Sequence, residues 1–273
     1  MKRRTFLLPF FCLFVLVGVL IRAQFTPAEL SQREEIERLL KTAEIVDSEE
    51  IGEGVTKPYR LFLRAGDVEL SGAWKNPKGI QKGYLEGWQY EIAAYQMDKL
   101  LGLNMVPPTV ERSFNGKKGS LQFWVAGEMS DLERMENGIK IPDSVKYRWE
   151  NRKYLTRAFD CIIANDDRTQ QNILYTKDWR TILIDHSRAF RSAREHTKRL
   201  MYGRNGIKGS MLFRRLPKNF VGRVEALTFD RIKEAVGPYL KNREIKAIIS
   251  RKEVFLGEIR EMIKEKGEEN VLY

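Results

Sequence analysis

Residues 159–190 read FDCIIANDDRTQQNILYTKDWRTILIDHSRAF. The pattern predicts an apolar helix end, a polar loop rich in carboxylates and amides, and two short buried strands. A carboxylate in the loop, Asp167, then lies close to an amide and a second carboxylate at the strand ends, Asn172 and Asp185. Phosphoryl transfer from a nucleotide needs such a set: one acid orients the attacking hydroxyl, and oxygen ligands hold magnesium on the phosphates.

The same residues carry a resemblance to a known superfamily. DDRTQQNIL (166–174) followed by LIDHSRAF (183–190) resembles the catalytic Asp-Arg-x-x-x-x-Asn loop and the metal-binding Asp-x-x motif of the atypical protein-kinase-like superfamily. Similar members are phosphatidylinositol 3-/4-kinases, secretory-pathway casein kinases and bacterial persistence-toxin kinases. The resemblance, which extends over most of residues 44–190, implies an α+β, two-lobed fold with an antiparallel-sheet N-lobe and a mainly helical C-lobe. It also implies an enzyme that transfers the γ-phosphate of ATP to a hydroxyl.

The resemblance assigns a role to each residue of the loop. Asp167 would orient the acceptor hydroxyl, and Arg168 would fix the loop by pairing with a neighbouring carboxylate. Asn172 and Asp185 would bind Mg²⁺ or Mn²⁺. The structural alternative for the whole set is a polar loop stabilised by its own Asx turns.

Two positions depart from the pattern of the superfamily. Thr169 stands where many relatives have histidine, which leaves the metal ligands intact but bears on the ordering of the loop. His186 follows the metal aspartate where other members carry Phe or Asn, and we expect it to pack or hydrogen-bond within the site. The chain has two histidines and two cysteines, Cys12 and Cys161, without a cluster typical of zinc. We expect Cys161 to be a buried core thiol.

The first half of the superfamily pattern begins with alternating apolar and polar residues, which predict three antiparallel strands at 45–51, 59–64 and 68–75. Gly52 and Gly54 lie in the first turn, where backbone N–H groups could approach a phosphate because neither residue has a Cβ. An ordinary hairpin turn would look the same. Lys75 ends the third strand, and the resemblance places it like the lysine that contacts nucleotide phosphates.

Residues 85–101 predict a helix closed by Gly102. In the resembling kinases a glutamate of this helix pairs with the strand lysine and fixes it against the phosphates. Glu91 is our candidate for that pairing, with Glu86 as the alternate and plain solvent exposure as the competing interpretation.

An apolar strand at 121–125 ends at Gly127, where the kinase-like fold needs a hinge that holds adenine. Phe123, Trp124 and Val125 are the candidate base contacts, although core packing is the commoner role of such residues. The first strong helix of the C-lobe is expected at 149–164. Further helices are expected around residues 229–239, 243–249 and 252–266.

The N-terminus predicts export across a membrane. A basic start, Met1–Arg4, precedes sixteen residues without charge and a small residue, Ala23. The segment is either a cleaved signal peptide or an uncleaved anchor, so the remainder is expected to be secreted or membrane-anchored, in a periplasmic, extracellular or lumenal compartment. The expected organisation is a signal at 1–23, a leader helix at 24–43, an N-lobe at 44–127 and a C-lobe at 128–273.

The amino-acid composition limits the number of domains and the kinds of binding partner. The 273 residues, 42% hydrophobic and 31% charged, suit one kinase-like fold. The net charge is +11, and because residues 1–23 contribute four positive charges, the rest carries +7. A basic surface suits anionic lipid, ATP or an acidic protein. Residues 191–220 are especially basic, which fits either a docking site for an acidic substrate or a solvated face.

Two other functions remain open. The first is a pseudokinase or binding module that holds an acidic partner in a basic groove; the complete Lys, Asp, Asn and Asp set favours the enzyme, whereas the export signal and Thr169 favour this alternative. A bacterial compartment beyond the membrane normally lacks ATP, whereas a secretory lumen contains it.

The second alternative function is an acidic-ligand or nucleic-acid binder. Its ligand binding would weaken steeply with salt and would not depend on magnesium. A nucleic-acid partner is the least favoured. The acceptor, whether protein, lipid or sugar, is not specified by the sequence.

Overall fold

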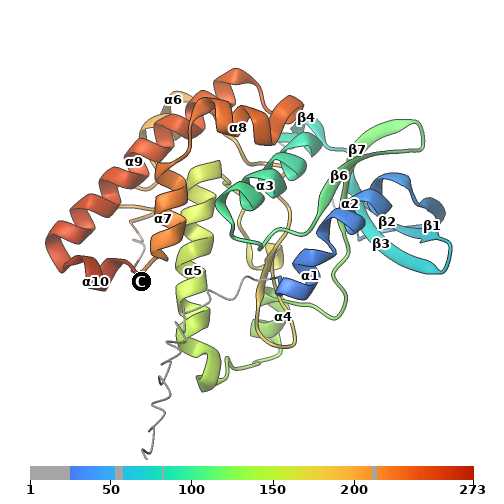
Figure 1. Cartoon of the computed structure of the whole chain (residues 1–273), viewed down its shortest axis with the longest axis horizontal. Helices are drawn as coiled ribbons and strands as arrows, with labels where there is room; N and C mark the ends of the chain where they lie inside the picture. The colour runs from blue at the N-terminus through green and yellow to red at the C-terminus, as the bar shows by residue number, and fades with distance from the viewer. Residues whose placement is uncertain (1–24, 53–57, 82, 211–213) are drawn as a thin grey trace, which may run out of the picture.

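The computed structural model describes residues 25–52, 58–81, 83–210 and 214–273 (Figure 1). The predicted signal segment and Gly54 therefore lie outside the described residues. Within these ranges no helix is long and apolar enough to cross a membrane.

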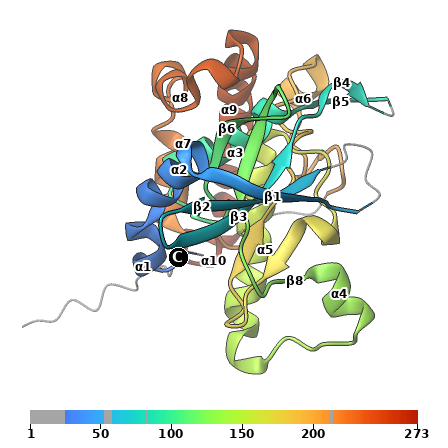
Figure 2. The same ribbon diagram turned by 90° about the vertical axis from the view of Figure 1, so that its right-hand side faces the viewer.

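The N-terminal part is built on a five-stranded antiparallel sheet (Figure 2). Its strands, in spatial order, are β1 (Glu44–Glu50), β2 (Tyr59–Ala65), β3 (Val68–Lys75), β7 (Lys117–Phe123) and β6 (Thr109–Phe114). The first three lie within one or two residues of their predicted positions. Leu61, Leu63 and Leu121 are buried on one face, where Leu40 packs against them. The alternation seen in the sequence therefore corresponds to one buried face of the sheet.

Two helical segments precede the sheet, and the second of them holds the next helix in place. The predicted leader helix forms two pieces, α1 (Pro27–Ser31) and α2 (Arg33–Thr42), and Thr26 begins the first with a capping box. Helix α3 (Trp88–Leu101) lies beside α2 and contacts β6 and β7. Glu37 of α2 accepts hydrogen bonds from the hydroxyl of Tyr95 at 2.5 Å and from Nζ of Lys99 at 2.8 Å. Helix α2 thus fixes one side of α3.

The predicted start of α3 at residue 85 is wrong. Residues 84–87 form β5 (Tyr84–Gly87), which pairs with β4 (Lys78–Gln81) in a short hairpin. Gly87 is extended, and its N–H donates to the carbonyl of Ser187 at 2.9 Å, so the helix begins one residue later. Gly102 ends α3 at φ 64°, as the glycine predicted. This hairpin places Glu86 on a strand.

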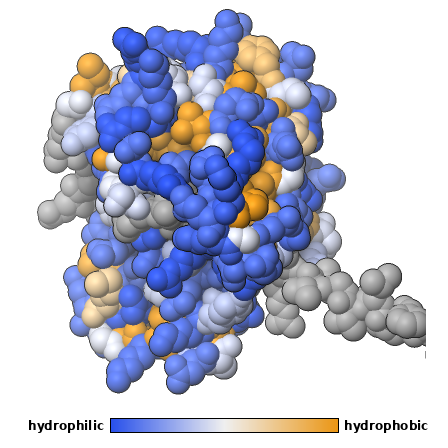
Figure 3. Space-filling model, turned by 90° about the vertical axis from the view of Figure 1, so that its left-hand side faces the viewer, coloured by the Kyte–Doolittle hydropathy of each residue, from blue (hydrophilic) through white to orange (hydrophobic). Residues whose placement is uncertain are grey.

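The C-terminal part is mainly helical, so the fold class is α+β, as predicted. Its elements in chain order are β8 (Met129–Ser130), α4 (Asp131–Glu136), α5 (Asp143–Ile163), the 3₁₀ turn η1 (Gln170–Asn172), β9 (Ile173–Tyr175), β10 (Thr181–Leu183), α6 (Arg194–Lys198), α7 (Lys218–Glu225), α8 (Phe229–Val236), the 3₁₀ turn η2 (Gly237–Tyr239), α9 (Asn242–Lys266) and α10 (Glu268–Val271). Helix α5 begins six residues before the predicted start. The face that carries α9 and α10 is mostly hydrophilic (Figure 3).

The two helices predicted at 243–249 and 252–266 are one continuous helix, α9, with a buried arginine at its middle. Arg251 is fully buried in the middle of α9. Its Nε donates to the carbonyl of Ile162 at 2.9 Å, and its Nη1 donates to the carbonyls of Arg191 at 2.7 Å and His196 at 3.2 Å. Burial lowers the pKa of Arg251 to about 9. The helix therefore ties the end of α5 to the segment after the loop.

Replacing Arg251 by alanine should lower the free energy of unfolding by about 3 kcal/mol, because it leaves buried carbonyls without donors and opens a cavity. Arg260→Ala removes an exposed arginine of the same helix and should change stability by no more than about 0.5 kcal/mol. Urea unfolding of the two variants measures the difference. Equal stabilities would contradict the structural role given to Arg251.

Candidate active site

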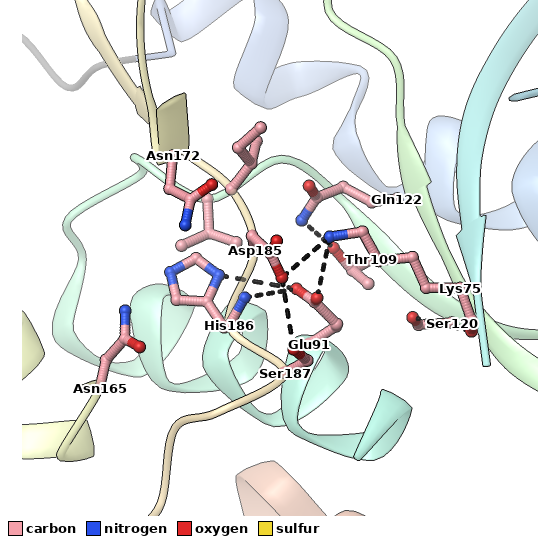
Figure 4. Close-up of polar contacts among 12 residues, drawn as sticks. Lys75, Glu91, Thr109, Ser120, Gln122, Asn165, Asn172, Asp185, His186 and Ser187 are labelled. Carbon is pink, nitrogen blue, oxygen red and sulfur yellow. Dashed lines mark hydrogen bonds and ion pairs between the residues drawn. The ribbon is translucent and has the colours of Figure 1, made fainter. Parts of the chain in front are cut away.

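One lysine lies between two carboxylates at the centre of the site. Lys75, at the end of β3, places its Nζ 3.3 Å from Oε1 of Glu91 on α3 and 3.0 Å from Oδ1 of Asp185. Figure 4 shows the lysine reaching from the sheet toward both acids. The side chain of Glu91 is only 2% exposed, whereas that of Asp185 is 36% exposed. Three residues that are far apart in sequence therefore meet in one charged cluster.

Lys75 and Glu91 stabilise each other's charged forms in this cluster. Burial disfavours the ammonium of Lys75, but Asp185 and Glu91 outweigh it and raise the lysine pKa well above its usual value. Burial likewise opposes ionisation of Glu91, yet Lys75 and contacts with His186 hold the glutamate pKa far below its usual range. The backbone N–H of His186 donates to Oε2 of Glu91 at 2.9 Å, which uses the second carboxylate oxygen.

Arg168 braces the loop that carries Asp167. Its Nε and Nη2 donate to the two oxygens of Asp160 on α5 at 3.1 and 3.0 Å. Its Nη1 donates to the carbonyls of Asn172 and Ile184, both at 2.9 Å. The arginine and aspartate side chains are 4% and 0% exposed. Sequence reasoning expected a carboxylate partner for Arg168 but did not identify Asp160, whose only signal was an acid in an apolar helix end.

His186 completes the brace as a neutral residue. Its Nε2 lies 2.8 Å from Nη2 of Arg168. Because a guanidinium can only donate, Nε2 must accept, and the ring hydrogen of the neutral tautomer then sits on Nδ1. Burial lowers the pKa of His186. The structure thus places His186 within the hydrogen-bond network of the site, as predicted.

Asn172 and Asp185 are the predicted cation ligands, and a backbone hydrogen bond joins the segments that carry them. The side-chain amide of Asn172 donates to the carbonyl of Asp167 at 2.8 Å, so its Oδ1 keeps its lone pairs for another ligand. The N–H of Ile184 donates to the carbonyl of Asn172 at 3.2 Å, which joins the two segments. Asp185 has φ 58°, a left-handed backbone that non-glycine residues seldom adopt. Among the described residues no group of three or more His, Cys, Asp or Glu could hold a metal ion.

An arginine that sequence reasoning missed contacts the loop aspartate. Nη1 of Arg188 lies 3.2 Å from Oδ2 of Asp167, and its Nε donates to Oε1 of Glu86 at 2.8 Å. The guanidinium also lies 4.5 Å from the ring centre of Tyr84. Burial raises the pKa of Asp167, and Arg188 opposes that rise. Glu86, the alternate partner for Lys75, therefore pairs with Arg188.

Asp166, the residue before Asp167, is likewise bound by an arginine. Arg191 donates from Nε to Oδ2 of Asp166 at 3.0 Å and from Nη1 to the carbonyl of Leu85 at 2.9 Å. Arg188 and Arg191 thus each join strand β5 to one aspartate of the loop. The hairpin that sequence analysis missed is consequently part of the support of the site.

A cavity of about 270 Å³ opens beside Lys75. Phe123, Trp124 and Val125, the predicted base contacts, line it. Leu174 and Ala73 contribute further apolar wall. Gly52 is not among its lining residues; it lies in the turn after β1 with φ 64°. The structure therefore brings the predicted hinge residues and Lys75 to one cavity and leaves Gly52 outside its wall.

The chain is similar to solved kinase structures at low sequence identity. No protein-family model matches the sequence, and no curated protein matches it. The structure of hydra Fam20 with sugar is 16% identical, with 93% of this chain and 95% of that chain covered and a TM-score of 0.66. The Golgi casein kinase with Mn/ADP bound is 14% identical, with 89% and 78% covered and a TM-score of 0.67. The Helicobacter pylori proinflammatory kinase CtkA is 11% identical, with 84% and 97% covered and a TM-score of 0.50.

The chain has an atypical protein-kinase-like fold. The fold predicted from residues 159–190 is thereby confirmed. At this level of identity the matches establish the kinase-like fold alone, so the roles of individual residues and the boundary between the two lobes remain predictions.

The brace of the kinase-like loop can be tested by Asp160→Asn. The change leaves the buried guanidinium of Arg168 without its counter-charge and should cost about 3 kcal/mol of unfolding free energy. Asp178→Asn is the matched control, because Asp178 also pairs with an arginine but is 62% exposed, and it should cost about 1 kcal/mol or less. Chemical denaturation distinguishes the two. A cost for Asp160→Asn no larger than that of the control would refute the brace.

A second prediction concerns Glu128, which lines the cavity of the kinase-like fold. Burial raises its pKa from 4.5 to about 7, and its Oε2 has no hydrogen-bond partner in the described part of the chain. Because the folded-state pKa is the higher one, ionisation destabilises the fold; the cost is absent below about pH 4.5 and complete above about pH 7.

Glu128→Gln removes this ionisation. The melting temperature of the variant relative to the native chain should therefore rise between about pH 5 and pH 8. Glu136→Gln, an exposed position of α4, should show no such trend. A difference that stays constant with pH would show that Glu128 titrates normally.

Proposed function

We propose that this chain binds ATP with Mg²⁺ or Mn²⁺ and transfers the γ-phosphate to a hydroxyl acceptor. The observation that carries the proposal is the placement of Lys75 between Glu91 and Asp185 at one end of an apolar-walled cavity. The kinase-like fold supports it, and the Golgi casein kinase with Mn/ADP bound has the same fold.

Each residue then has a distinct task. Lys75, held by Glu91, contacts the phosphates, and Asn172 and Asp185 supply the protein oxygens for the cation. A bound cation would neutralise charge on the β- and γ-phosphates. Asp167 orients the acceptor hydroxyl and receives its proton. Its carboxylate is 30% exposed and therefore open to an acceptor from solvent.

Arg188 positions Asp167 for that task. The arginine contacts Asp167, Glu86 and Tyr84 together, so the direction of the aspartate side chain is fixed from the hairpin side. Its positive charge also favours the ionised carboxylate, which is the form that can accept a proton.

The acceptor class and the location remain proposals as well. We propose a protein, lipid or sugar hydroxyl as acceptor, in a compartment reached through the predicted N-terminal signal. Docking of an acidic substrate on residues 191–220 receives limited support, because several of their basic side chains are already bound within the molecule. These are Arg191 to Asp166, Arg199 to Glu195, Arg204 to Glu258 and Glu265, and Lys218 to Glu268.

The second candidate is a pseudokinase or binding module. One observation favours it: both aspartates of the loop, Asp166 and Asp167, are engaged by arginines. In an active enzyme the acceptor hydroxyl must reach Asp167 beside Arg188, whereas a binding module has no such requirement.

Titration with ATP tests the proposal. In the presence of Mg²⁺, ATP at a hundredfold excess over its dissociation constant should stabilise the chain by about 2.7 kcal/mol. Asp185→Ala should abolish the metal-dependent part of this shift. Asp67→Ala, which removes an exposed carboxylate in the β2–β3 turn, should keep it. No shift with millimolar nucleotide would refute the proposal.

A second readout of the same samples separates the two candidates. ATP consumption that falls by a factor of about 100 or more in Asp167→Asn, with the thermal shift retained, would identify an enzyme. A metal-dependent shift without any turnover in the native chain would identify the binding module instead.

A further inference from the structure

A second cavity lies on the other side of the loop brace. It has a volume of about 350 Å³, within the range of small-molecule sites, and shares no lining residue with the cavity beside Lys75. Its walls are α4, one face of α5, the strands β9 and β10, and Tyr202. Two residues of the brace, Asp160 and Arg168, form part of its lining.

Three side chains on one turn of α5 present donors to this cavity. Lys153, Thr156 and Arg157 all line it, and the spacings of three and four residues put them on the same helix face. Thr156 is 4% exposed. No carboxylate pairs with either cation among the described residues, and the hydroxyl of Thr156 has no hydrogen-bond partner there.

The other charged groups of the wall are already satisfied. Arg134 donates to Asp131 at 2.7 Å. All five N–H groups of Arg168 are engaged, and Asp160 accepts three hydrogen bonds. The unbalanced charge that faces the cavity is therefore the two positive charges of Lys153 and Arg157.

Aromatic and apolar groups form the rest of the pocket and hold Arg157 in place. The guanidinium of Arg157 lies 5.9 Å from the ring centre of Tyr154 and 5.7 Å from that of Tyr202. Trp149 and Met135 line the cavity, and Met135 is 50% exposed although it is a large apolar residue. The site thus combines a guanidinium beside two tyrosine rings with a surface suited to a ring or short apolar group.

We propose that this cavity binds a phosphate monoester. The phosphate dianion accepts hydrogen bonds from Lys153, Thr156 and Arg157, and its two negative charges match the two unpaired cations. The organic group of the ester packs against Trp149 and Met135. The proposal does not depend on nucleotide binding at Lys75, since the two cavities have separate walls.

The location of this site couples it to the loop. The wall of this cavity includes Asp160 and Arg168, which together hold the segment of Asp167. If ligand binding shifts the conformational equilibrium of this segment, a shift of that equilibrium must change the ligand affinity by the same factor.

Binding of phenyl phosphate and of inorganic phosphate to the full chain tests the proposal. The probes distinguish a site for the whole ester from a site for phosphate alone. Lys153→Gln with Arg157→Gln should weaken phenyl phosphate binding at least tenfold, as expected from the loss of charge-assisted hydrogen bonds. Lys146→Gln with Arg148→Gln removes the same charge from the same helix outside the cavity wall and should leave binding within about twofold.

Thr156→Val keeps the shape of the wall and removes one donor, so it serves if the double variant does not fold; it should weaken binding about three- to tenfold. Tighter binding of phenyl phosphate than of inorganic phosphate would support contact with Trp149 and Met135. Equal affinity in the cavity variants and the native chain, or no binding of either probe at millimolar concentration, would overturn the proposal.

Discussion

The buried ammonium of Lys75 is the constraint on which the site depends. A charge in the protein interior is tolerated only when it is paired, and here two carboxylates from two other elements supply the pairing. The cluster of Lys75, Glu91 and Asp185 carries one excess negative charge. That excess lies toward Asp185, the more exposed acid, and so toward the side from which a cation could approach.

Helix α3 determines whether this pairing exists. It packs against the sheet through β6 and β7 and against the C-terminal helices α5, α7 and α8. Most of its residues are buried, including Tyr95 and Met97. Because α3 is packed on both sides, Glu91 cannot move away from Lys75 without disturbing both parts of the molecule. The ion pair is thus a property of the whole packing arrangement.

The features that could be predicted from the sequence alone are those that depend on residues close together in the chain. Strands with one buried face and the helix end at Gly102 follow from local patterns, and both were predicted correctly. The pairing of Lys75 with Glu91 came from the resemblance to kinases, and spacing alone would not have separated Glu91 from Glu86. The separation arises because β5 pairs with β4, which turns residue 86 into a strand residue. Arg188 was missed because its partner Glu86 lies far away in the sequence and becomes a neighbour only after folding. Asp160 was missed although Arg168 is near in the sequence, because an acid in an apolar helix end does not indicate which cation it pairs with.

Arg168 occupies a position whose hydrogen bonds only an arginine side chain can make. Its guanidinium uses all five N–H groups on five different acceptor atoms, drawn from α5, the loop and the strand end. Lysine, the only other permanently cationic side chain, has three N–H donors and no planar fork. No other amino acid among the twenty can therefore reproduce this connection, and the position is restricted to a single residue type by geometry rather than by charge.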